Sequence, residues 1–224
     1  MLSMVAVAPL GFMPSLPLPP RPRAARGGGG EVEAMQDDQR MVIHNVPWET
    51  YIAITDALGE RAGLRVCYCE GTLELMGPGY AHEDTKKRIS RLLELYAYLS
   101  DVPIHGLGSM TYRRKPRRRG AEPDECYYVG KVSKGPPHIA VEVAISRSMI
   151  DKLSLYAGLG VSELWIWEGG HLGVHLLGKS GNYREVKRSR ALPDLDVEEL
   201  SSFVQMPDQN AAVKAYGKQL QKKG

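Results

Sequence analysis

The sequence predicts an α/β fold in which a mixed β-sheet is flanked by helices. Three observations predict it. Residues 80–100 carry one apolar stripe at helical spacing. Several short apolar runs read as strands, and two pairs of them are joined by hairpin turns. These helices and strands alternate without a strict βαβ repeat. A chain of 224 residues is long enough for one domain with a substantial core.

The clearest expected helix covers residues 80–100. Its apolar stripe consists of Ile89, Leu92, Leu93, Tyr96 and Leu99. A first helix is expected over residues 47–61, with Pro47 at its first position and Gly63 after its end. Two shorter helices are expected, one in the amphipathic run that Lys152 opens and one over residues 196–204, capped by Asp196.

The expected strands are short and lie mostly in the second half of the chain. Residues 64–70 and 72–76 form a hairpin that turns at Glu70 and Gly71. Residues 102–112 carry one or two strands. Further strands are expected at 126–129, 138–145, 162–168, 171–177 and 182–187, and the last two of these are joined by a glycine-containing turn.

Composition divides the chain into three parts. Residues 1–40 are rich in proline and glycine and are expected to be disordered, because such a segment cannot form a regular core element. Residues 41–206 carry the periodic apolar pattern of the folded domain. Residues 207–224 are expected to form a polar C-terminal helix or tail.

Charge, hydropathy and cysteine content limit the class of protein. No long uncharged apolar stretch occurs, so no membrane-spanning helix is expected. Three cysteines in a chain of this size indicate reduced thiols and a cytoplasmic location. The net charge of +3 is mild, but residues 113–119, RRKPRRR, hold six basic side chains in seven positions. This run either contacts a phosphate backbone or forms a solvated loop.

Two carboxylates and a lysine form the candidate site. Asp124 lies at the start of one apolar strand, Glu142 lies inside the next, and Lys152 follows both. A buried acid is costly unless something neutralises it. If the two strands are neighbours, Asp124 and Glu142 meet on one side of the sheet, where a cation between them would offset their repulsion. Mg²⁺ suits such a pair, with Mn²⁺ as the alternative. A structural ion pair between Glu142 and Lys152 is the other interpretation.

The stretch from Gly71 to Tyr183 resembles the Uma2 family, a bacterial group with the restriction-endonuclease-like PD-(D/E)xK fold. The matching segments, in chain order, are GTLELMGP followed by His82, then EPDECYYV, PPHIAVEVAIS, DKLSLYAGLGVSELWIWE and HLGVHLLGKSGNYREV. The resemblance implies a restriction-endonuclease-like mixed sheet and a Mg²⁺-dependent endonuclease that hydrolyses DNA phosphodiester bonds.

The resemblance also implies roles for individual residues. Asp124 and Glu142 would be metal ligands, and Lys152 would be the catalytic lysine, supplied by a helix because Ala144 stands two residues after the acid. His82 matches the family's histidine near the site, with helix capping or packing as its alternative role. The segment between Glu142 and Lys152 is shorter than the family's usual linker, so Arg147 is an alternative source of the charge.

A rival hypothesis is a catalytically inactive DNA-binding or partner-binding module that retains the fold. It is motivated by the short linker before Lys152 and by the basic run at residues 113–119. For an active enzyme, a homodimer would suit the cutting of both strands of a duplex.

Overall fold

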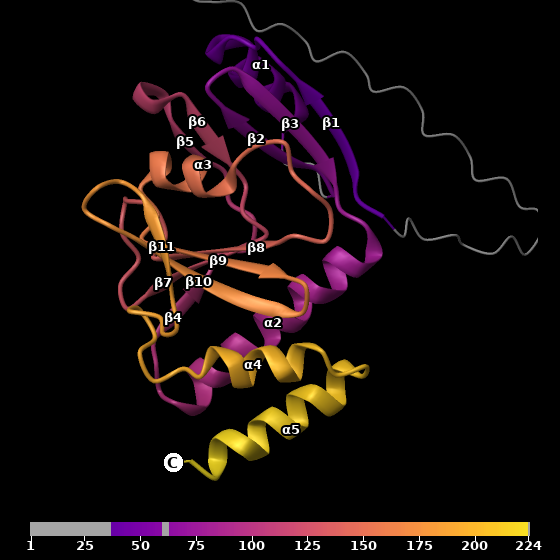
Figure 1. The fold of residues 1–224 in the computed structure, drawn as a ribbon, viewed down its shortest axis with the longest axis vertical. Coiled ribbons are helices and arrows are strands. Elements are labelled where there is room, and N and C mark those ends of the chain that lie inside the picture. The colour runs from indigo at the N-terminus through magenta and orange to yellow at the C-terminus, as the bar shows by residue number, and fades with distance from the viewer. Residues whose placement is uncertain (1–36, 60–62, 224) are drawn as a thin grey trace, which may run out of the picture. The chain divides into compact units, whose positions relative to one another are not determined.

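The computed structural model describes residues 37–59 and 63–223 (Figure 1). The chain divides into a unit of residues 1–33 and a unit of residues 34–224, and the fold below is that of the second unit. The sequence predicts disorder for residues 1–40, and residues 1–36 of that segment lie outside the described residues. Strand β1 (Gln39–Ile43) begins inside that segment, so the fold takes in two residues that the sequence analysis placed before the domain.

One sheet, here called sheet A, contains the first predicted hairpin. The hairpin pairs β2 (Arg65–Cys69) with β3 (Thr72–Gly77), and both turn residues, Glu70 and Gly71, have positive φ, as predicted for this type of turn. The strand order is β1-β3-β2-β6-β5, with β5 (Tyr112–Arg114) and β6 (Arg119–Ala121) at the other edge, and all pairings are antiparallel. The basic run therefore lies on a hairpin with a 3₁₀ turn at Lys115–Arg117, and all of its basic side chains except Arg119 are exposed.

The second sheet, sheet B, is the predicted mixed sheet. Its strands are β4 (Ile104–Gly106), β7 (Glu125–Val129), β8 (Ile139–Val143), β9 (Glu163–Glu168), β10 (His171–Leu177) and β11 (Tyr183–Val186). The order is β11-β10-β9-β8-β7-β4, and β8 and β9 run parallel while the other neighbours are antiparallel. The predicted α/β fold is thus confirmed, with the first hairpin in a separate sheet.

The helices follow the predicted pattern with shifted ends. They are α1 (Trp48–Leu58), α2 (Tyr80–Leu99), α3 (Lys152–Leu159), α4 (Val197–Val204) and α5 (Gln209–Gln221). Helix α1 ends at Gly59, which has a φ of 60°, and not at Gly63. Asp151 and Asp196 cap α3 and α4 through their carboxylates. The predicted C-terminal segment contains α5, which buries Ala212 and Tyr216.

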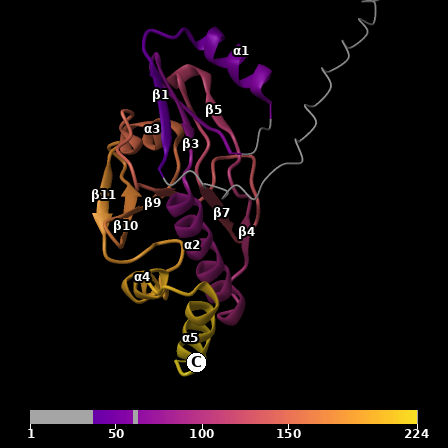
Figure 2. The same ribbon diagram turned by 90° about the vertical axis from the view of Figure 1, so that its right-hand side faces the viewer.

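The helices cover the two faces of sheet B unequally. Helices α2 and α4 lie on one face, with α5 packed against these two helices, whereas α3 and sheet A lie on the other face, as the two views show (Figures 1 and 2). Successive side chains of strand β8 point alternately to these two faces of sheet B. Ile139, Val141 and Val143 enter the core beneath α2 and α4, and Ala140 enters the smaller core beneath α3. The alternation points Glu142 toward α3 and sheet A.

Two further findings concern the membrane and the cysteines. None of the helices in residues 37–59 and 63–223 has the length and apolar character needed to cross a bilayer. Cys67, Cys69 and Cys126 are all free thiols, as the odd cysteine count predicted.

Candidate active site

Asp124 and Glu142 lie on neighbouring strands of sheet B. Strands β7 and β8 pair with Glu125 opposite Val141, and continuing this register places Asp124 opposite Glu142. The Asp124 amide donates to the Val141 carbonyl, and its carboxylate Oδ2 accepts from the Val143 amide at 2.8 Å. Both carboxylates are buried. The predicted meeting of the two acids on one side of the sheet is therefore what the strand pairing produces.

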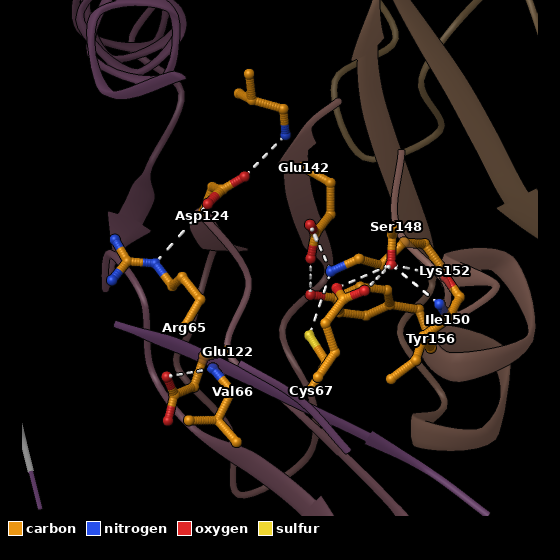
Figure 3. A network of polar contacts seen from close by, with 12 residues as sticks. Arg65, Val66, Cys67, Glu122, Asp124, Glu142, Ser148, Ile150, Lys152 and Tyr156 are labelled. Carbon is orange, nitrogen blue, oxygen red and sulfur yellow. Dashed lines mark hydrogen bonds and ion pairs between the residues drawn. The ribbon is translucent and has the colours of Figure 1, made fainter. Parts of the chain in front are cut away.

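Lys152 reaches Glu142 from the start of α3. Its Nζ lies 3.0 Å from Glu142 Oε2, and it also donates to the sulfur of Cys67 at 3.2 Å. Tyr156, one helical turn later, donates its hydroxyl to the other oxygen, Glu142 Oε1. Figure 3 shows these groups converging. The short linker thus brings Lys152 to the acid, whereas Arg147 is exposed.

His82 and Arg65 approach the other acid. His82, in the first turn of α2, places Nε2 2.9 Å from Asp124 Oδ1, and Arg65 Nε lies 3.8 Å from the same oxygen. The second ring nitrogen of His82, Nδ1, lies 3.4 Å from Asp38 Oδ2. The histidine is therefore held between the carboxylates of Asp38 and Asp124.

A second ring of polar contacts anchors the linker between β8 and α3. The Ser146 hydroxyl donates to Asp38 at 2.7 Å, and the Ser148 hydroxyl donates to Glu74 Oε1 at 2.9 Å. Arg40 bridges the two acids, at 2.8 Å from Glu74 and 3.5 Å from Asp38. These contacts tie the linker to β1 and β3, which explains how a short linker holds Lys152 in position.

Burial disfavours the charged forms of Asp124, Glu142 and Lys152, whereas nearby opposite charges favour these forms and shift each pKa the other way. Burial raises the pKa of Glu142, with Lys152 opposing this shift and Asp124 adding to it. Burial also acts to raise the pKa of Asp124, but the hydrogen bond and charge of His82 outweigh it and lower the pKa. Burial acts to lower the pKa of Lys152, whereas the carboxylates of Glu142 and Asp124 raise it above its ordinary value. The lysine is therefore charged at neutral pH.

Two hydrogen-bonding neighbours, Cys67 beside Lys152 and Tyr156 beside Glu142, are neutral. Burial raises the pKa of the Cys67 thiol to about 11. Burial and the nearby Glu142 raise the pKa of Tyr156 well above its usual value. Tyr156 is thus a hydrogen-bond donor at neutral pH, and Cys67 is not a thiolate nucleophile.

His82 is expected to make stability depend on pH. Burial acts to lower its pKa, but Asp124 and Asp38 outweigh burial and raise it. A raised folded-state pKa gives stabilisation that is complete below the unfolded value of about 6.5 and is lost as the pH rises through the folded-state pKa. Replacing His82 by asparagine should therefore cost about 1.5–3 kcal/mol at pH 6 and less at pH 9, measured by urea unfolding in EDTA. An equal cost at both pH values would contradict a charged His82.

The donor set at this site is suited to a hard cation. Mg²⁺ binds through one or two carboxylates and keeps several waters. Asp124 and Glu142 supply such a pair, and each of their oxygens retains a lone pair beyond the contact it makes here. Among the described residues, no group of three or more His, Cys, Asp or Glu side chains is arranged to hold a metal ion. Asp124 and Glu142 are therefore the residues that could hold a divalent cation such as Mg²⁺ or Mn²⁺ that keeps most of its waters.

Comparison with known proteins assigns the family. A sequence model of the Uma2 family, described as "Putative restriction endonuclease", matches residues 48–207. The chain belongs to the Uma2 family. A search of curated proteins found no similar sequence. The Uma2 match takes in His82, Asp124, Glu142 and Lys152, and it begins after Asp38.

Several residues of this Uma2 site are absent from the sequence-based prediction. Glu74 carries a signal, since it is an acid inside the apolar strand TLELM, just as Glu142 is inside HIAVEVAI. No pattern in the sequence indicates a role for Asp38 or Arg40, because both lie in the segment that is interpreted as disordered. Arg65 and Cys67 stand on a strand whose contact with sheet B depends on tertiary packing.

Proposed function

We propose that this Uma2 protein is a Mg²⁺-dependent endonuclease that hydrolyses phosphodiester bonds in DNA. The observation that carries the proposal is the convergence of three charged side chains from three elements. Lys152 lies 3.0 Å from Glu142, and the strand register puts Asp124 beside Glu142. Membership of a family described as a restriction endonuclease supports the same reaction class and supports DNA as the substrate.

Each side chain has a role in the proposed reaction. Asp124 and Glu142 would hold the cation, Mg²⁺ or alternatively Mn²⁺. When bound, the metal supplies a polarised water and offsets charge on the phosphate oxygens. The Lys152 ammonium would donate an N–H hydrogen bond to the attacked phosphate or to the attacking water, where its positive charge stabilises developing negative charge. Lys152 is suited to this role because it is charged and held by a buried carboxylate.

Two other residues fix the orientation of the carboxylates. Tyr156 donates to Glu142 Oε1 and so limits rotation of that carboxylate. His82 contacts Asp124 Oδ1, and Asp38 on the far side of the ring holds the imidazole in place. Such supporting contacts keep metal-binding groups in a productive orientation.

A second function is favoured by one observation. All four carboxylate oxygens of Asp124 and Glu142 already have a protein donor within hydrogen-bond distance. Carboxylates that each have protein donors in this way are also what an inactive DNA-binding or partner-binding module with this fold would retain. The two functions differ in whether the paired site admits a divalent cation.

Cleavage of supercoiled plasmid DNA distinguishes these functions. Purified protein is expected to nick or linearise the plasmid with Mg²⁺ or Mn²⁺ and to leave it intact in EDTA, because the metal supplies several kcal/mol of transition-state stabilisation. The measurement is the fraction of each topological form on a gel. Cleavage that is equal in EDTA would contradict metal dependence, and an intact plasmid with either metal would favour the inactive module.

A further inference from the structure

The basic run at residues 113–119 does not act as one patch, because its side chains separate onto different sides of the β5–β6 hairpin. Arg113 turns toward α1, where it donates to Thr55 at 2.7 Å. Lys115 also turns toward α1, at 3.8 Å from Glu49, and Arg118 donates to the Tyr68 hydroxyl at 3.1 Å. The remaining arginines face α3. The run thus divides into a group engaged with α1 and β2 and a group that lines a cleft.

That cleft has a volume of about 530 Å³ and lies between the β5–β6 hairpin, α3 and the turn from β10 to β11. Side chains that can donate hydrogen bonds line it from all three elements, among them Arg114, Arg117, Arg119, Ser154, Ser180 and Asn182, and the acids Glu70 and Asp151 also line it. Guanidinium, hydroxyl and amide groups are all hydrogen-bond donors to phosphate oxygens. The cleft is therefore built from donors that belong to separate parts of the chain.

The acidic side chains at the cleft are already engaged. Glu70 pairs with Arg119 at 3.0 Å, and the Asp151 carboxylate accepts from the Leu153 amide at 3.0 Å. Arg117 is exposed, and its guanidinium has no ion-pair or hydrogen-bond partner in the described part of the chain. Arg119 is only 8% exposed, yet its Nε lacks a hydrogen-bond partner among the described residues. The Arg117 guanidinium is therefore an accessible positive donor at the cleft, unpaired within residues 37–59 and 63–223.

The cleft adjoins the proposed catalytic lysine. Asp151 and Leu153, the neighbours of Lys152 in the sequence, both line it, while Lys152 turns inward to Glu142. Farther along α3, Gly158 allows Arg119 to lie against the helix, since a Cβ at that position would stand 2.7 Å from Arg119 Cγ. Arg114 donates to the Gly158 carbonyl at 3.2 Å. One helix thus presents the amine on one side and the arginine-lined cleft on the other.

We infer that this cleft binds the phosphate backbone of duplex DNA next to the cleavage site, with Arg117 as its main contact. The inference rests on the proposed action on DNA and adds which part of the surface holds the substrate. A backbone contact of this kind positions a duplex without reading its sequence. The cleft offers charge and hydrogen-bond donors, and its apolar and aromatic lining is limited to Leu153, Ala157 and Tyr183, which suits phosphate better than bases.

Binding of a fluorescein-labelled DNA duplex, measured by fluorescence anisotropy in EDTA over a series of salt concentrations, tests this inference without cleavage. Arg117→Ala is expected to weaken binding about three- to tenfold and to reduce the slope of log affinity against log salt by about 0.9. Arg117→Lys is expected to retain most of the slope. Lys115→Ala is the matched control, because it removes an equal charge from the same hairpin and its side chain is 74% exposed.

A variant on the β10–β11 turn distinguishes DNA binding in the cleft from DNA binding to the charged hairpin alone. Ser180→Asp adds a negative charge across the cleft on the β10–β11 turn and is expected to weaken binding as Arg117→Ala does. Equal losses for Arg117→Ala and Lys115→Ala, or no effect of Ser180→Asp, would overturn the inference. So would the absence of duplex binding at low salt. Cleft-dependent binding by a protein that cleaves no plasmid would support the inference and refute the proposed nuclease.

Discussion

Exchange of Glu142 for glutamine is expected to lower metal-dependent plasmid cleavage by about 10³-fold or more. The exchange keeps the shape of the side chain but removes the charge that attracts the cation and holds the Lys152 amine at 3.0 Å. Several kcal/mol of metal-derived stabilisation of the transition state would be lost, and each 1.36 kcal/mol is a factor of ten in rate. The measurement is the initial rate of plasmid nicking at saturating Mg²⁺.

The same exchange also affects folding, so the cleavage rate needs a stability control. Removing one partner of a buried ion pair costs about 3–5 kcal/mol, and a thermal melt at the assay conditions shows whether Glu142→Gln remains folded. Glu168→Gln is the matched variant, because Glu168 ends the adjacent strand β9 and is exposed. We expect Glu168→Gln to cleave at the wild-type rate. Wild-type cleavage by folded Glu142→Gln would exclude Glu142 as a metal ligand.

The pairing of the two acids was predictable because both lie at strands with strong patterns. In residues 138–145 large and small apolar side chains alternate, and this alternation alone identifies the face that Glu142 shares with Ala140. The chain order then leaves β7 as a natural neighbour of β8. The helical run KLSLYAGL likewise predicted that Lys152 and Tyr156 point the same way, and both contact Glu142.

The remaining parts of the site depend on contacts between distant segments, which a single sequence does not reveal. Asp38 approaches His82 across 44 positions in the chain, and Ser146 reaches Asp38 across 108. Strands β4, β5 and β6 are three residues long, so they are too short for an alternating pattern to appear. The division of the basic run into two groups likewise depends on the pairing of β5 with β6, which the run of charges does not reveal.

Exchange of Lys152 for methionine is expected to destabilise the protein by about 3–5 kcal/mol in EDTA. Methionine fills a similar volume but carries no charge. Glu142, which is only 6% exposed, would then stay buried beside Asp124 without the positive charge of the lysine. The free energy of unfolding from urea titrations measures the loss. Cleavage should also fall to background, because the donor to the phosphate or the water is absent.

A double-mutant cycle tests whether this loss comes from the ion pair. With Lys152→Met and Glu142→Gln together, no uncompensated charge remains between these two side chains. The double variant should therefore be more stable than Lys152→Met alone, with a coupling of about 1–3 kcal/mol. Lys131→Met, at an exposed loop position, is the control for the chemical change and should leave stability unchanged within about 0.5 kcal/mol. Additive effects would mean that the two side chains do not interact.

Adding Mg²⁺ to the unfolding measurements of the same variants tests whether Asp124 and Glu142 bind a divalent cation. In the wild type the charge of Lys152 already offsets that of Glu142. In Lys152→Met a bound metal ion would be the only cation that offsets the charges of Asp124 and Glu142. A ligand that binds only the folded state stabilises it in proportion to its occupancy. Millimolar Mg²⁺ should therefore raise the free energy of unfolding of Lys152→Met more than that of the double variant. If Mg²⁺ stabilised neither, Asp124 and Glu142 would serve only as partners of His82 and Lys152, and the inactive module would be the better account of this Uma2 protein.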